Sequence, residues 1–183
     1  MADVRPFVIA IGTSAGGLET LTKLFDGLPK TPNLAIVVLQ HLSPDHKSLM
    51  GELLARHSSM PIVSIEDQQK IEGGMIYLLP PKYLLGVEKG VFQLEKRLAG
   101  NVVQFPIDRF FEQLAADQPD RAVAIILSGT GTDGTRGIKV IKEKGGTVIV
   151  QDPKEAKFDG MPNSAISTQL ADLILEVAQI QSV

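Results

Sequence analysis

The sequence predicts an α/β fold: a doubly wound, mostly parallel sheet with helices on both faces and an antiparallel hairpin appended in the middle. Apolar, strand-like runs alternate with stretches in which apolar residues recur at helical spacing. The run at 34–39 is apolar throughout, which is typical of a parallel strand covered on both faces. Over residues 7–65 the order is βαβαβ, and right-handed crossovers turn that order into a doubly wound sheet.

Periodicity and turn residues locate the elements in order. The first helix is expected to bury Leu21, Leu24 and Phe25, which recur at helical spacing. The middle of the chain is predicted to be a hairpin, because Glu-Lys-Gly at 88–90 separates two strand-like runs. The unpatterned segment 96–105 is expected to be a surface loop. The expected strands are 7–11, 34–39, 61–65, 75–79, 83–87, 91–94, 122–127 and 147–150. The expected helices are 17–27, 47–57, 107–116 and 134–144. After the last strand we expect a loop over 152–162, a helical turn near 164–168 and an apolar end at 173–175.

Length and composition limit the class of protein. A chain of 183 residues, 44% of them hydrophobic, can build one core, and we expect residues 1–183 to form a single domain. The apolar runs are too short to span a membrane and the N-terminus lacks a signal-peptide pattern, so a cytoplasmic protein without membrane insertion is expected. The absence of cysteine fits that compartment and excludes thiolate catalysis. A net charge of −3 offers no basic surface for nucleic acid.

Three strand ends carry reactive side chains. Ser14 follows the first strand in a glycine-framed turn, His41 follows the second, and Asp133 lies in the loop after the strand at 122–127. In an open α/β sheet, functional groups gather outside the carboxyl ends of the strands. A serine hydroxyl becomes nucleophilic when a neutral imidazole removes its proton, and a carboxylate can orient that imidazole. The three residues therefore suit acyl transfer.

Simpler interpretations of the same residues stay open. A glycine-framed turn also binds anions at a helix N-terminus, and Ser14 can serve as a helix cap. His41 can be an ordinary loop histidine, and Asp133 can cap the helix that follows it. His57 is expected to be structural, at the end of a helix where a cation suits the dipole. A metal site made of His41, His46 and His57 lacks a carboxylate cluster and ligand spacing, so no metal is expected.

A nucleotide-binding regulatory module is the alternative function. The loop Gly129–Gly134 (GTGTDG) matches G-x-G-x-x-G between a predicted strand and a predicted helix, and Asp152 lies where a ribose-binding acid would lie. Against this alternative, the motif comes late in the chain and leaves Ser14 and His41 without a role. Asp133 would also bring a carboxylate close to a pyrophosphate, which is electrostatically unfavourable.

Four segments in order resemble the CheB-type protein-glutamate methylesterase family of bacterial chemotaxis. They are residues 8–17 (VIAIGTSAGG), Gln40-His41, residues 128–134 (SGTGTDG) and residues 158–162 (FDGMP), and the resemblance covers about residues 7–175. It implies a doubly wound α/β fold and hydrolysis of glutamate γ-methyl esters on the cytoplasmic helices of chemoreceptors, with release of methanol. Some members of that family also deamidate receptor glutamines. The family uses neither a metal nor an organic cofactor, so none is expected here.

The resemblance also implies a role for each candidate residue. Ser14 becomes the nucleophile, His41 the general base and then the general acid, and Asp133 the partner that orients His41. The expected oxyanion donors are backbone N–H groups near Thr130 and at Ala15. Such donors are each worth about 3 kcal/mol in a transition state.

This chain departs from the family's usual pattern at several positions. Ala15 replaces a threonine, Thr130 replaces a methionine, and Leu-Ser-Pro at 42–44 replaces Met-Pro after the histidine. Backbone donors survive these changes, whereas the side chains lining the pocket differ. No receiver domain is expected before the first strand. These features resemble the methylesterase segment of methylesterase–methyltransferase fusion proteins, so a fused or associated methyltransferase is an expected partner.

Overall fold

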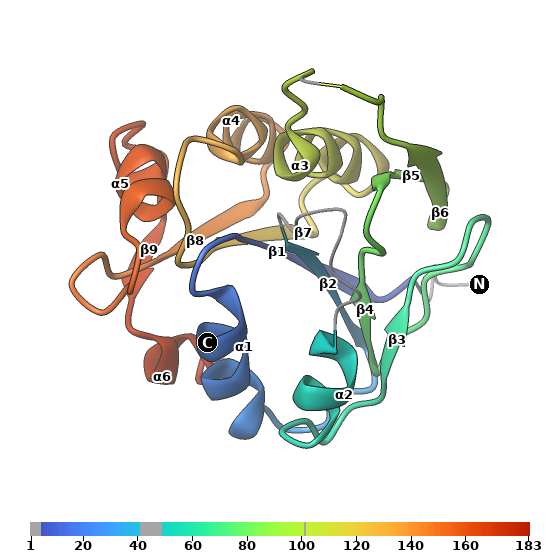
Figure 1. Cartoon of the computed structure of the whole chain (residues 1–183), viewed down its shortest axis with the longest axis horizontal. Coiled ribbons are helices and arrows are strands. Elements are labelled where there is room, and N and C mark those ends of the chain that lie inside the picture. The colour runs from blue at the N-terminus through green and yellow to red at the C-terminus, as the bar shows by residue number, and fades with distance from the viewer. Residues whose placement is uncertain (1–4, 41–48, 101) are drawn as a thin grey trace.

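A seven-stranded parallel sheet runs through the centre of the molecule (Figure 1). The computed structural model describes residues 5–40, 49–100 and 102–183. The strand order is β3-β4-β2-β1-β7-β8-β9, and every pairing in this sheet is parallel. The strands are β1 Phe7–Thr13, β2 Leu34–Gln40, β3 Ile62–Ser64, β4 Met75–Leu78, β7 Ala122–Ile126, β8 Thr147–Gln151 and β9 Leu173–Leu175. The order reverses beside β1, and this switch point is where open α/β sheets bind their ligands.

Helices cover both faces of the sheet, as the sequence predicted (Figure 1). Along β1, Val8 and Ala10 belong to one apolar core while Ile11 belongs to the other, because successive side chains of a strand point to opposite faces. The first core is closed by α3 Pro106–Asp117 and α4 Thr135–Glu143, and the second by α1 Gly17–Asp26, α2 Met50–Ala55 and α6 Val177–Ile180. In the described residues, no helix is both long and apolar enough to cross a bilayer.

The helix α3 matters most for the site described below. Ile107, Phe110, Phe111 and Leu114 recur at helical spacing and are all fully buried, so this face of α3 anchors it on the sheet. Pro106 occupies the first turn, where a proline costs no hydrogen bond. The N-terminal end of α3 is thereby held in one position beside the carboxyl ends of β1 and β7.

The predicted hairpin is present, but it does not extend the main sheet. The strands β5 Tyr83–Glu88 and β6 Val91–Lys96 form a separate antiparallel pair. This pair packs on α3: Val87 N–H donates to Gln113 Oε1 at 3.1 Å, and the ring of Phe92 lies against that of Phe110 with centroids 6.5 Å apart. The run before the hairpin is β4, an inner strand between β2 and β3.

The C-terminal part differs most from the expectation. Residues 152–162 were expected to be a loop, yet the helix α5 Gly160–Ile166 begins within them. Pro162 lies in the first turn of α5, where a helix tolerates proline. The apolar end became the edge strand β9, and the short α6 closes the chain with a capping box between Glu176 and Gln179.

Candidate active site

Ser14 lies at the carboxyl end of β1, where the pairing of β1 with β7 continues past both strands. Leu127 N–H donates to Gly12 O at 2.9 Å, and Ser14 N–H donates to Ser128 O at 3.1 Å. The carbonyl of Ser14 accepts the N–H of Gly17 at 3.0 Å, which closes the turn into α1. Ser14 itself is half-buried. Its backbone is therefore held on both sides, while part of the residue remains open to solvent.

The interpretation of Ser14 as the cap of α1 is wrong. The N-cap is Gly16, with φ of 75°, and no side chain caps this helix. Glycine adopts this left-handed conformation at no steric cost. A Cβ at Gly16 would also lie 2.8 Å from Ser128 Oγ. The glycine thus permits a tight turn that leaves the Ser14 hydroxyl uncommitted to the helix.

Asp133 does not cap the helix that follows it. The N-cap of α4 is Gly134, and no side chain caps α4. The Asp133 carboxylate instead accepts the backbone N–H groups of Ile107 at 3.1 Å and Asp108 at 2.9 Å, in the first turn of α3. These N–H groups have no partner inside their own helix, and the positive end of the α3 dipole favours an anion there. The carboxylate is therefore held by backbone donors from another element.

Burial sets the protonation of Asp133. Desolvation raises the pKa of Asp133 to about 6, although the N–H groups of Asp108 and Ile107 oppose the shift. The carboxylate of Asp108 raises it further. Nearby, burial lowers the pKa of Arg97, and the charge of Asp133 acts in the opposite direction. Asp133 can thus change its charge close to neutral pH.

One cavity of about 200 Å³ brings Ser14 and Asp133 together, with Thr130 and Met161 among the residues that line it. The backbone N–H groups of Ala15 and Thr130 donate no hydrogen bond within the described part of the chain. Free N–H donors beside a serine hydroxyl are the components of an oxyanion hole. This arrangement can bind a carbonyl group and stabilise the negative charge that develops on its oxygen.

His41 and His46 lie outside the described residues. Gln40, which precedes them, ends β2, and its Cα pairs with that of Thr13, the neighbour of Ser14. The role of His41 stays a prediction. His57 lies elsewhere, with its Nδ1 3.2 Å from Asp26 Oδ1 at the end of α1. Among the residues that the structure describes, no three His, Cys, Asp or Glu side chains group as metal ligands would.

Internal packing accounts for two glycines of the G-x-G-x-x-G match. A Cβ at Gly129 would lie 2.3 Å from Met161 Sδ. At Gly134, where φ is 95°, a Cβ would lie 2.6 Å from Ile126 Cδ1. These glycines allow the chain to approach itself, which requires no pyrophosphate. The loop therefore does not favour the nucleotide-binding alternative.

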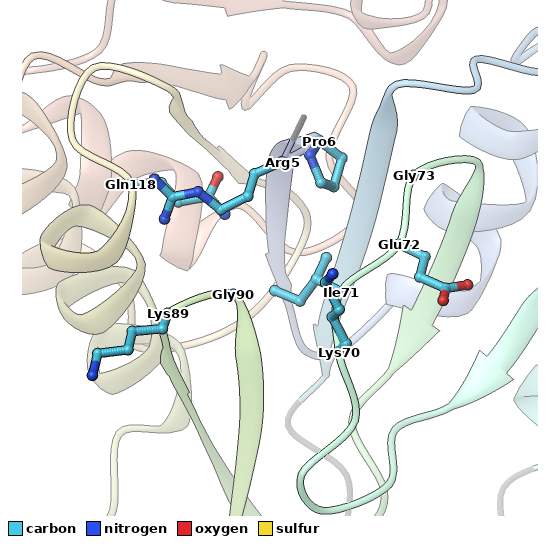
Figure 2. A pocket seen from close by; sticks show the side chains of 9 residues that line it. All are labelled: Arg5, Pro6, Lys70, Ile71, Glu72, Gly73, Lys89, Gly90 and Gln118. Atoms are coloured by element: carbon cyan, nitrogen blue, oxygen red, sulfur yellow. The ribbon is translucent and has the colours of Figure 1, made fainter. Parts of the chain in front are cut away.

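A second cavity lies at the opposite edge of the sheet, before β1, β4 and β7 (Figure 2). It measures about 340 Å³, and Arg5, Lys70 and the buried Gln118 are among the residues that line it. None of the described residues around it carries a hydroxyl or an imidazole. This cavity is therefore not a candidate for serine hydrolysis.

Two supporting residues, Ser128 and Gln151, were not predicted from the sequence. Both are buried, and Ser128 N–H donates to Gln151 Oε1 at 2.8 Å. Ser128 belongs to the segment 128–134 that carries part of the family resemblance, but its side-chain partners are Ala15 and Phe158. These partners lie far away along the chain, so no local pattern could reveal them.

Comparisons with known proteins agree on one family. The family model described as CheB methylesterase matches residues 9–183. The crystal structure of the Thermotoga maritima CheB methylesterase catalytic domain superposes with a TM-score of 0.89 at 32% identity, covering 97% of this chain and 96% of that one. None of these comparisons supports the nucleotide-binding alternative.

Curated relatives differ widely in length. A putative protein-glutamate methylesterase/protein-glutamine glutaminase of Leptospira interrogans is 34% identical over 94% of this chain, which covers 90% of that protein. The Thermotoga maritima protein-glutamate methylesterase/protein-glutamine glutaminase is 32% identical over 94% of this chain, which covers 52% of it. An uncharacterized 104.1 kDa protein of Rhodobacter capsulatus is 44% identical over 72% of this chain, which covers only 14% of that protein.

Proposed function

The chain belongs to the CheB methylesterase family, and from that premise we propose that it is a serine hydrolase that removes methyl groups from glutamate γ-methyl esters of chemoreceptors. The observation that carries the proposal is the cavity at the carboxyl edge of the sheet, which Ser14 and Asp133 line together. The N–H groups of Ala15 and Thr130, which donate to no acceptor among the described residues, support it, because ester hydrolysis passes through an oxyanion that such donors stabilise.

The proposed mechanism assigns one role to each candidate residue. Ser14 Oγ attacks the ester carbonyl carbon while His41 takes its proton, and the carbonyl oxygen becomes an oxyanion beside Ala15 and Thr130. The intermediate collapses, the C–O bond to the methoxy group breaks, and His41 returns the proton so that methanol leaves. Water then attacks the acyl-serine with His41 as base, which releases the glutamate side chain and restores Ser14. Throughout, Asp133 orients His41 and stabilises its imidazolium form.

The substrate and partners are proposed on the same premise. The proposed substrate is a methylated glutamate on a cytoplasmic helix of a chemoreceptor. The names of the Leptospira and Thermotoga relatives include protein-glutamine glutaminase, which supports deamidation of receptor glutamines as a second reaction of this site. Deamidation differs only in the leaving group, which is ammonia in place of methanol. A fused or associated methyltransferase is the further proposed partner, and the long Rhodobacter relative is compatible with a multidomain arrangement.

Replacement of the nucleophile tests the proposal. Ser14→Ala should abolish methanol release from a methylated receptor fragment, with an unchanged thermal unfolding midpoint. Ser167→Ala is the matched control, because Ser167 is exposed at the C-cap of α5 and its hydroxyl donates to the carbonyl of Asn163, one turn earlier. A serine-directed phosphonate should label the wild type at Ser14, as mapped by mass spectrometry. Methanol release retained in Ser14→Ala, or a phosphonate adduct at another serine, would contradict the mechanism.

A further inference from the structure

The side chain of Ser128 joins the nucleophile turn to the segment that enters α5. Ser128 is fully buried. Its hydroxyl donates to Ala15 O at 2.9 Å and accepts the N–H of Phe158 at 3.0 Å. A hydroxyl has one proton to donate and lone pairs to accept, so both contacts can be made at once. Two segments that are distant in sequence are therefore connected through a single oxygen atom.

The backbone carbonyl and N–H of Ser128 are hydrogen-bonded as well. Its carbonyl accepts the N–H of Ser14 at 3.1 Å and the hydroxyl of Thr13 at 2.8 Å. Its N–H donates to Gln151 Oε1 at 2.8 Å, and Gln151 Nε2 in turn donates to Glu155 Oε2 at 3.2 Å. Every polar atom of Ser128 thus has a partner, and three of these contacts reach residues 13–15. A buried network with all its members satisfied is rigid.

These contacts determine where the reacting groups point. The Ser14 carbonyl is held by Gly17 N–H and the Ala15 carbonyl by Ser128 Oγ, so the peptide planes on both sides of Ala15 are fixed. The first of these planes carries the N–H of Ala15, the residue that follows the cavity-lining Ser14. The contact with Phe158 also holds the side of the cavity that Met161 lines. Gly129 N–H donates to Phe158 O at 2.9 Å, and Met161 N–H donates to Gly129 O at 2.9 Å.

We propose that Ser128 is a positioning residue for ester hydrolysis: its hydroxyl locks the Ser14–Ala15 turn against the segment 158–161, and so holds the nucleophile and the Ala15 donor in the geometry of attack. This inference rests on the proposed function. Loss of the hydroxyl leaves Ala15 O and Phe158 N–H without their partner, and the turn gains freedom to move. A misplacement of about 1 Å at a reacting group can cost about 100-fold in rate.

The test compares Ser128→Ala with Ser58→Ala in the full chain. Ser58 is a matched control, since its hydroxyl donates to Met60 O at 2.9 Å and accepts Met60 N–H at 3.0 Å, before β3. Ser128→Ala should lower kcat for methanol release roughly 10- to 100-fold, with KM changed less than about threefold. The rate of phosphonate labelling at Ser14 should fall by a similar factor. Ser58→Ala should keep the wild-type kcat and the wild-type rate of phosphonate labelling, even if its thermal stability falls. Ser128→Thr, which retains the hydroxyl, should recover most of the lost turnover.

The outcomes separate this inference from the proposed function. A wild type that neither releases methanol nor is labelled at Ser14 overturns both. An active wild type and an inactive Ser14→Ala, together with wild-type kcat and labelling rate in Ser128→Ala, overturn the role of Ser128 alone. Equal losses of turnover in Ser128→Ala and Ser58→Ala also overturn it, because they reflect general destabilisation. A folded Ser128→Thr whose turnover is as slow as that of Ser128→Ala also overturns the role of Ser128.

Discussion

The carboxylate of Asp133 accepts the backbone N–H of Ile107 at 3.1 Å, so an acidic residue from the loop before α4 is bound at the N-terminus of α3. The neighbouring N–H of Asp108 binds the second carboxylate oxygen at 2.9 Å. Two donors on adjacent residues hold both oxygens and leave the carboxylate little freedom to rotate. These two contacts relate the position of α3 to the electrostatics of Asp133, and the first two predictions concern this carboxylate.

The first prediction concerns stability and pH. Burial raises the pKa of Asp133 to about 6 in the folded protein, above its ordinary value of 3.8. Between these two values the unfolded chain loses its proton while the folded chain keeps it, so the free energy of unfolding falls as pH rises from about 4 to about 6. Asp133→Asn removes this titration. The free energy of unfolding of the wild type relative to Asp133→Asn should therefore fall by about 1–3 kcal/mol over that range.

Urea unfolding at pH 4, 5, 6 and 7 measures this difference. Asp120→Asn serves as the control, because Asp120 is exposed before β7 and its side chain accepts no hydrogen bond in the described residues. The control should follow the wild type at every pH. A wild type that gains stability relative to Asp133→Asn as pH rises from 4 to 6 would contradict the raised pKa.

The second prediction concerns activity and pH. A protonated Asp133 cannot stabilise the imidazolium of His41, so kcat/KM should fall as the pH drops below about 6. The apparent value belongs to the pair of Asp133 and His41, since strongly interacting groups titrate together. Asp133→Asn should lose at least about 100-fold in turnover at pH 7.5. Methanol release between pH 5 and 8 measures both effects, and a flat profile with full activity at pH 5 would exclude an ionised Asp133 from the mechanism.

The third prediction concerns the turn after Ser14. Gly16→Ala forces a side chain onto a residue with φ of 75° and places its Cβ 2.8 Å from Ser128 Oγ. The backbone strain alone is worth about 1–2 kcal/mol, and the clash pushes away the hydroxyl that holds Ala15. We expect a lower thermal unfolding midpoint together with turnover that is slower by at least about tenfold, the order of effect that misplaced reacting groups produce.

A second glycine separates strain from clash. Gly100 has φ of 89°, and no atom of the described residues other than its chain neighbours lies within 4 Å of a Cβ built on it. Gly100→Ala should therefore lose a similar amount of stability and keep its turnover rate. Methanol release and thermal unfolding of both variants distinguish the effect of backbone strain from the effect of the clash with Ser128. Wild-type turnover in Gly16→Ala would show that the contact between Ser128 and the turn has no part in catalysis.

The sequence predicted the parts of the fold that depend on residues close together along the chain. Apolar runs located β1, β2 and β7, and helical spacing located α1, α3 and α4 to within one or two residues at most ends. The placement of β4 inside the sheet was not predictable, because the strand next to it in space, β2, is separated from it in the chain by α2 and β3. The hairpin was predicted, whereas its packing on α3 depends on contacts such as Val87 with Gln113.

By itself, the sequence determined which residues reach the carboxyl edge of the sheet. Ser14 and Asp133 follow apolar strands, and a strand followed by a glycine-rich turn exposes its next residues through local geometry alone. Only the tertiary structure decided how they are held. The N-terminus of α3 captures Asp133, and Ser128 connects Ala15 to Phe158. The physical reason is that burial and hydrogen bonding depend on residues that meet only after folding: burial raises the pKa of Asp133, and the hydrogen bonds of Ser128 orient the turn of Ser14.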